Sequence, residues 1–243
     1  MPVKIGIRPV SATAIVALRG FGLAFALASL WACTQPSRAQ APPPPPQARF
    51  VVVLDAAHGG DDVGARFKGM TEKDFTLALS VRLRSLLSAR GIQVVTTRES
   101  DAAIDLNRRA EVANHATAQA CLSLHASDSG AGPHLFVSSL APTQPTVFAA
   151  WKTAQSAWVS RSLALAGVLN SALLQAGMTP TLGRTALPAV DSMTCPAVAI
   201  EIAPLRAAGH KTTASLDDPG YQANVAGALA AAILEWKSEA RQP

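Results

Sequence analysis

The chain has 243 residues, of which 49% are hydrophobic and 15% are charged, which is enough for one substantial core but hardly for two. Its formal charge is +5, but four of the cations, Lys4, Arg8, Arg19 and Arg38, precede residue 40 in a stretch without acids. The remaining chain is nearly neutral and lacks the cluster of basic residues that would bind nucleic-acid phosphates. We therefore expect one monomeric domain with no nucleic-acid partner.

The first 40 residues have the pattern of an export signal, because a basic start is followed by the apolar run 21–30. Cleavage after Ser37-Arg38-Ala39, a small-x-small site, is the favoured interpretation. Two alternatives stay open: a lipoprotein signal at 30–33, which would tether the protein through lipidated Cys33, and an uncleaved membrane anchor. The protein is expected to be exported to the periplasm or cell envelope, where it is lipid-anchored or secreted.

A proline-rich linker is predicted at 41–48, since the consecutive prolines 42–46 favour an extended polyproline II spacer. The domain proper is expected over 49–240. Cys121 and Cys195 lie at or beside predicted buried strands, and we expect two buried free thiols there rather than a disulfide.

Short β-branched runs alternate with helical patterns from residue 50 onward, which indicates an α/β domain with a mostly parallel twisted sheet and helices on both faces. Strands are predicted at 50–54, 92–97, 120–124, 135–139 and 197–202. Helices are predicted at 72–90, 106–116, 158–176 and 225–236, the first and third stopped by Gly91 and Gly177. Residues 141–157 have the composition of a loop.

Chemically competent side chains follow several of these strands. The first strand leads to Asp55 and His58, the third to His125, and the strand at 197–202 to Glu201, while Glu72 opens the first helix. Because parallel strands present their carboxyl ends at one edge of a sheet, these groups should gather there.

Two imidazoles and one carboxylate that leave a fourth position for water form the arrangement of catalytic zinc sites. We predict that His58, Glu72 and His125 bind Zn²⁺. Glu201 is then the group that accepts the proton of an activated water and returns it to a departing amine.

Each of these residues also has a structural interpretation. Glu72 could be a first-turn acid beside Thr71 that is stabilised by the helix dipole. His58 could be a turn residue, and His125 a core histidine that is satisfied by the backbone. Glu201 directly follows a buried strand and should need a partner there.

Five ordered motifs resemble the zinc-dependent N-acetylmuramoyl-L-alanine amidases of the cell-separation type, over most of 49–238. They are Val51-Val52-Val53-Leu54-Asp55-Ala56-Ala57-His58-Gly59-Gly60, Thr71-Glu72-Lys73-Asp74-Phe75, Val94-Val95-Thr96-Thr97-Arg98, Leu106-Asn107-Arg108-Arg109-Ala110-Glu111-Val112-Ala113-Asn114 and Leu122-Ser123-Leu124-His125-Ala126. The resemblance implies that His58, Glu72 and His125 correspond to the zinc ligands of the family and Glu201 to its catalytic glutamate. Asp55, Arg109 and His134 are further candidates, as substrate-binding residues.

The activity implied by this resemblance is hydrolysis of the amide between N-acetylmuramic acid and the L-alanine of the peptidoglycan stem peptide, in cell-wall turnover or cell separation. Two alternatives stay open: a non-catalytic peptidoglycan-binding module of the same fold, and a zinc peptidase that cuts elsewhere in the stem peptide.

The chain departs from the family pattern at three places around the site. Ala56-Ala57 stands where the family has Pro-Gly, and Ile202-Ala203-Pro204-Leu205 stands where it has Val-Gly-Phe-Leu. Gly132-Pro133-His134 lacks the acid of the family's Gly-x-Glu. These changes leave the predicted ligands intact and indicate a shifted preference for the wall peptide.

Overall fold

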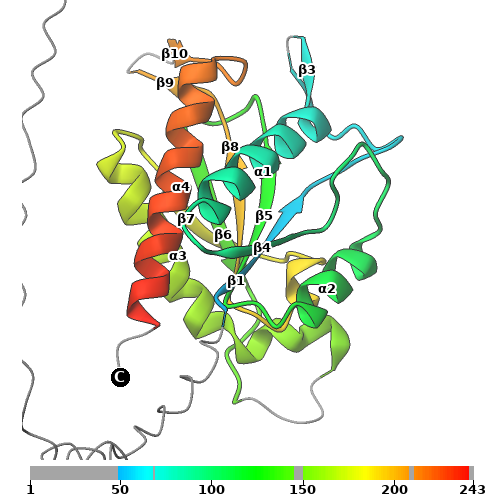
Figure 1. Ribbon diagram of the computed structural model, residues 1–243. Coiled ribbons are helices and arrows are strands. Elements are labelled where there is room, and N and C mark those ends of the chain that lie inside the picture. The colour runs from blue at the N-terminus through cyan, green and yellow to red at the C-terminus, as the bar shows by residue number, and fades with distance from the viewer. Residues whose placement is uncertain (1–48, 68, 145–149, 208–210, 241–243) are drawn as a thin grey trace, which may run out of the picture. The chain divides into compact units, whose positions relative to one another are not determined.

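A six-stranded sheet runs through the described part of the chain, with the strand order β4-β1-β5-β8-β6-β7 (Figure 1). The computed structural model describes residues 49–67, 69–144, 150–207 and 211–240. The predicted export segment and proline-rich linker lie outside these residues. Strands β4 (Gln93–Thr96), β1 (Val51–Ala56), β5 (Ala120–Ala126) and β8 (Ala197–Ile202) are mutually parallel, which confirms the predicted mostly parallel sheet.

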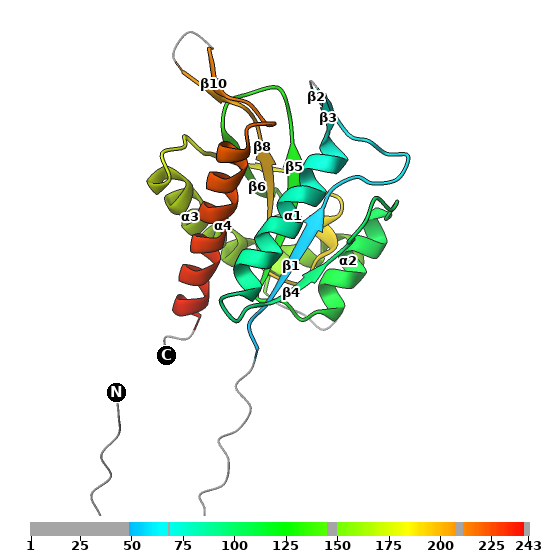
Figure 2. The same cartoon turned by 45° about the horizontal axis from the view of Figure 1, so that its top comes forward.

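The remaining two strands of the sheet run in the opposite direction to these four. Strand β6 (Pro133–Ser138) pairs antiparallel with β8, and β7 (Thr181–Thr185) pairs parallel with β6. The sequence did not predict β7, because its residues are mostly exposed and carry no alternating apolar pattern. Two short hairpins, β2 (Arg66–Phe67) with β3 (Met70–Thr71) and β9 (Leu205–Arg206) with β10 (Thr212–Ala214), stand at the upper end in Figure 2.

The described residues form four α-helices, which are α1 (Glu72–Ser88), α2 (Leu106–His115), α3 (Val159–Gln175) and α4 (Pro219–Glu239). The first three agree closely with the predicted ranges. The prediction for α4 began too late, since the helix starts at Pro219. The Asp218 side chain accepts hydrogen bonds from the Gly220 and Tyr221 amides, and proline suits the first helical position.

Two 3₁₀ helices, η1 (Trp151–Ala157) and η2 (Val190–Ser192), complete the described elements. The prediction of a plain loop at 141–157 was therefore wrong for its last part, where residues 151–157 are helical. No single helix in the described ranges has the length and apolar character needed to cross a membrane, and only η1 and α3 meet these criteria jointly, as a pair bent by 65°.

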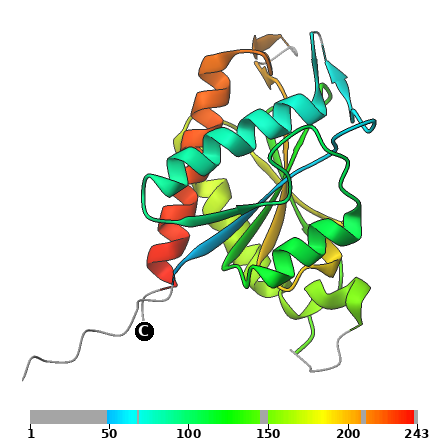
Figure 3. The ribbon, with the colours of Figure 1, turned by 45° about the vertical axis from the view of Figure 1, so that its right-hand side comes forward.

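Helices cover the two faces of the sheet unequally, as Figure 3 shows. The larger core packs α1, α3 and α4 against one face. On the other face a smaller core joins Val51, Val53 and Cys121 to α2 and to the segment around η2. Asp55, Ser123 and His125 continue the same alternating rows toward the carboxyl ends of the strands. Polar side chains therefore occupy this face near the carboxyl ends of the strands, beyond the smaller core.

Cys121 and Cys195 form a disulfide, with Cα atoms 6.3 Å apart. The prediction of two free thiols was wrong. The pairing of Cys121 with Ala197 in β5 and β8 brings the two sulfurs together in the smaller core, where both residues are buried. Burial predicted from sequence identifies an interior cysteine but not its neighbour on the next strand.

Candidate active site

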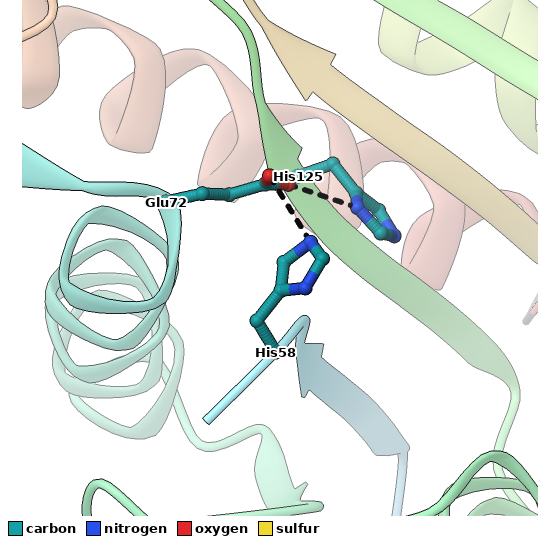
Figure 4. A group of neighbouring side chains, drawn as sticks. All are labelled: His58, Glu72 and His125. Carbon is teal, nitrogen blue, oxygen red and sulfur yellow. Dashed lines mark hydrogen bonds and ion pairs between the residues drawn. The ribbon is translucent and has the colours of Figure 1, made fainter. Parts of the chain in front are cut away.

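His58, Glu72 and His125 come together at the carboxyl edge of the sheet (Figure 4). His58 lies in the loop after β1, Glu72 is the first residue of α1, and His125 lies near the end of β5. One ligand atom from each residue falls within 4.8 Å of the other two. The three elements therefore deliver the donor set that the sequence predicted for a catalytic zinc site.

The carboxylate of Glu72 lies between the two imidazoles. Its Oε2 is 3.0 Å from His58 Nε2 and its Oε1 is 3.1 Å from His125 Nδ1. The Ala65 amide donates to Oε2 and the Ala126 amide to Oε1. Burial acts to raise the pKa of Glu72, but the hydrogen bond with His125, followed by those from the two amides, lowers it to about 2. A carboxylate that stays ionised in a buried position is suited to a cation, which favours the ligand interpretation over a helix-dipole role.

His58 is oriented by a second carboxylate, that of Asp62. Its Nδ1 lies 2.8 Å from Asp62 Oδ2, so that Nε2 faces Glu72. A metal-binding histidine characteristically gives its other ring N–H to such a carboxylate. The hydrogen bond to His58 is the main cause of a lowered pKa for Asp62. His58 also has a φ of 60°, which is strained for a residue with a side chain and which occurs preferentially at functional sites.

Two buried arginines hold the backbone at His58. Arg98 donates to the carbonyls of Ala56 and Ala57, and Arg109 donates to those of Ala56 and His58, all at 2.7–2.9 Å. Burial lowers the pKa of Arg98. The strained loop is therefore fixed through its carbonyl oxygens, which these cations satisfy in the interior.

Asp55 and Arg109 form a buried ion pair beneath the site. Arg109 Nη1 is 2.7 Å from Asp55 Oδ1, and the side chains of Arg109 and Asp55 are 4% and 2% exposed. Asp55 also accepts from the hydroxyls of Thr97 and Ser123, and Ser123 Oγ lies 3.4 Å from His125 Nε2. These contacts favour a positioning role for the pair, and its predicted contact with substrate remains a prediction.

Glu201 lies beside His125 on the neighbouring strand. The two residues are register partners in β5 and β8, so their side chains share one face of the sheet. Glu201 is half-buried, and within the described ranges its side chain makes no hydrogen bond or ion pair. The partner expected from the sequence is therefore not found among the described residues. A half-buried carboxylate at a strand end does not need one, because water can hydrate it.

His134 flanks Glu201 on the opposite side from His125. It is the register partner of Glu201 in β6, and its Nδ1 is 2.7 Å from the hydroxyl of Thr181 in β7. A row of His125, Glu201 and His134 therefore crosses three strands on one face. The structure brings all the predicted site residues to this edge, but it does not test what each one does.

No sequence pattern predicted a separate role for Asp62 or Gly64. Gly64 has a φ of +63°, and a Cβ placed on it would lie 2.6 Å from Glu72 Oε2 and from His58 Cδ2. A larger residue there would push the ligands apart. The only signal in the sequence was their place in a glycine-rich stretch four and six residues after His58.

A sequence model of the Amidase_3 family, described as N-acetylmuramoyl-L-alanine amidase, matches residues 52–235. The chain belongs to this family. A curated relative, the germination-specific N-acetylmuramoyl-L-alanine amidase of Bacillus subtilis, is 36% identical over 89 residues, which are 31% of this chain and 38% of the relative. The amidase AmiA of Escherichia coli is 43% identical over 77 residues, covering 31% and 27%. The chain thus spans about a third of the length of these relatives.

Solved structures agree over a larger part of the chain. The catalytic domain of CwlV, an amidase from Bacillus (Paenibacillus) polymyxa, has a TM-score of 0.61 at 29% identity and covers 78% of this chain and 98% of its own. The amidase AmiC2 of Nostoc punctiforme has a TM-score of 0.59 at 24% identity, with 79% and 98% covered. The described domain accordingly has the fold of amidase catalytic domains.

Proposed function

We propose that this chain hydrolyses the amide that joins N-acetylmuramic acid to the L-alanine of the peptidoglycan stem peptide. The observation that carries the proposal is the position of Glu201, which is in register with His125 and shares a sheet face with the His58, Glu72 and His125 cluster. Membership in the amidase family supports the choice of bond.

We assign Zn²⁺ to the cluster, with His58 Nε2, His125 Nδ1 and the Glu72 carboxylate as ligands. The donor set fits, because two imidazoles and an ionised carboxylate face one another and each has a second contact that orients it. When bound, the ion supplies Lewis-acid polarisation of the scissile carbonyl and lowers the pKa of a water.

The residues of the chain carry out the proton transfers in this proposal. Glu201 accepts a proton from the attacking water and returns it to the amine as the C–N bond breaks. Among the described residues its side chain has no polar partner, which suits this role because no such hydrogen bond has to be broken before transfer. Asp62, and Ser123 together with Asp55, hold the two imidazoles in their tautomers.

We further propose that the protein acts outside the cytoplasm, in the periplasm or cell envelope. The basic start and apolar run of residues 1–40 support export, and a peptidoglycan substrate requires it. The disulfide between Cys121 and Cys195 is consistent with an oxidising compartment.

The test is a digest of purified peptidoglycan with the purified full chain, with and without a chelator, followed by mass analysis of the products. The proposal predicts intact stem peptides with a free L-alanine amine, and their release is lost with the chelator and in Glu201→Ala. Fragments cut inside the peptide would indicate a zinc peptidase. Zinc and peptidoglycan binding without any cleavage would indicate a binding module. Either outcome would overturn the proposal.

A further inference from the structure

Two cavities flank His125 on the site's face of the sheet. The first, of about 330 Å³, is lined by His58, Asp62, Arg109 and His125 together with part of the loop before α2. The second, also of about 330 Å³, is lined by His125, Phe136, Thr185, Leu187, Ala199 and Glu201. We call them the polar cavity and the Phe136 cavity. His125 lines both, so the site has two sides.

The two cavities differ in chemistry. The polar cavity has the carboxylates of Asp55, Asp62 and Asp105 and the guanidinium of Arg109 in its wall. In the Phe136 cavity the lining residues are apolar except for the Thr185 hydroxyl and the two site residues, His125 and Glu201. Glu201 lines the Phe136 cavity and not the polar cavity, so the catalytic carboxylate lies on only one side of His125.

This placement matters because amide hydrolysis ends with a proton on the leaving nitrogen. One water is consumed: its oxygen forms a bond to the carbonyl carbon, the C–N bond breaks, and the proton that Glu201 took from the water passes to the amine. A proton donor must lie within hydrogen-bond reach, about 2.6–3.2 Å, of the atom that it protonates. The nitrogen and the group attached to it must therefore lie on the Glu201 side of the site.

We propose that the Phe136 cavity is the subsite for the first residue of the peptide, on the amine side of the scissile bond, and that the polar cavity receives the acyl side. This proposal rests on the proposed function. The lining predicts selection for an apolar side chain at that residue. An acidic side chain would lose its hydration there without gaining a cation partner, since the wall contains the Glu201 carboxylate and neither lysine nor arginine among its lining residues. A branched aliphatic side chain fits a cavity of this volume.

The first test uses the zinc-loaded full chain and four soluble N-acetylmuramoyl peptides that differ only in the first residue, which is glycine, alanine, valine or aspartate. The subsite predicts that kcat/KM for valine stays within about tenfold of that for alanine and that aspartate falls about tenfold or more below valine. A smaller loss with aspartate would overturn the assignment. If none of the four is cleaved, the proposed function itself fails, which is a separate result.

The second test fills the cavity from its exposed rim. Thr185 lies on β7 with its side chain on the site's face. Leu182 of the same strand points to the opposite face, where its register partner Leu135 is buried. Thr185→Trp should reduce kcat/KM for the valine peptide by about tenfold or more and for the glycine peptide by less than about threefold. Leu182→Trp, the matched control, should leave the valine-to-glycine ratio unchanged. Equal effects of the two variants on this ratio would overturn the subsite.

Discussion

The two halves of the site differ in how firmly their side chains are held. In the ligand half, His58, Glu72 and His125 each have at least two polar contacts, and a buried ion pair supports them from below. In the catalytic half, Glu201 stands over an apolar cavity and has no polar partner among the described residues. Rigid ligands favour a metal, and an unpaired carboxylate can exchange protons. The comparison predicts that metal binding and turnover can be separated by mutation.

The largest expected effect comes from removing the carboxylate between the imidazoles. Glu72→Ala should abolish zinc retention and reduce turnover on the order of 10³-fold or more, because the metal loses a ligand and each imidazole loses its contact with the carboxylate between them. Metal content and peptide release measure the two effects. His115→Ala, which removes an exposed imidazole at the end of α2, is the control and should change neither. Full zinc content in Glu72→Ala would refute the ligand set.

A second prediction concerns the support beneath the ligand half. Arg109→Met should lower the free energy of unfolding by about 3–5 kcal/mol, since it leaves the buried Asp55 carboxylate without its cation. Its neighbour Arg108 makes an exposed pair with Glu111, so Arg108→Met should cost about 0–1 kcal/mol. Denaturant unfolding of both variants gives the comparison. Similar losses would show that the Asp55 pair is not a structural support.

A third prediction concerns the orientation of His58. Asp62→Ala should weaken zinc binding by about 10–100-fold, because the imidazole loses the carboxylate that fixes its tautomer. Competition with a chelator measures the affinity. Asp61→Ala removes the adjacent acid, which makes no hydrogen bond to His58, and should leave the affinity unchanged. Equal affinities in the two variants would contradict the positioning role of Asp62.

The smallest expected effect is in the catalytic half. His134→Ala should reduce kcat/KM by only about two- to fivefold, because His134 flanks Glu201 but makes its hydrogen bond to Thr181. Steady-state kinetics on a soluble muramoyl peptide measure this. A loss as large as that of Glu201→Gln would show that the two residues act together.

Much of the fold followed from the sequence because its signals are local. The apolar run before Asp55 and the helical spacing after Glu72 each predict one element. Strand β7 and the two-residue strands of the hairpins could not be predicted in this way, because they are exposed or too short to show a period.

The site residues that lie at the ends of strands could be predicted from the sequence, because the strand topology determines where those ends lie. His125 and Glu201 follow from parallel topology. The contact of Asp62 with His58 depends on a left-handed loop conformation, and the disulfide depends on which strand lies beside β5. Both depend on three-dimensional neighbours that no local pattern contains.

The most direct test of the separation between the halves is Glu201→Gln, measured for zinc content and for release of stem peptides on the same preparation. The account predicts that the variant retains zinc like the unmodified chain while peptide release falls by about 10²–10⁴-fold. Loss of zinc in Glu201→Gln would place this residue among the ligands. Unchanged peptide release would show that the proton is transferred by another group.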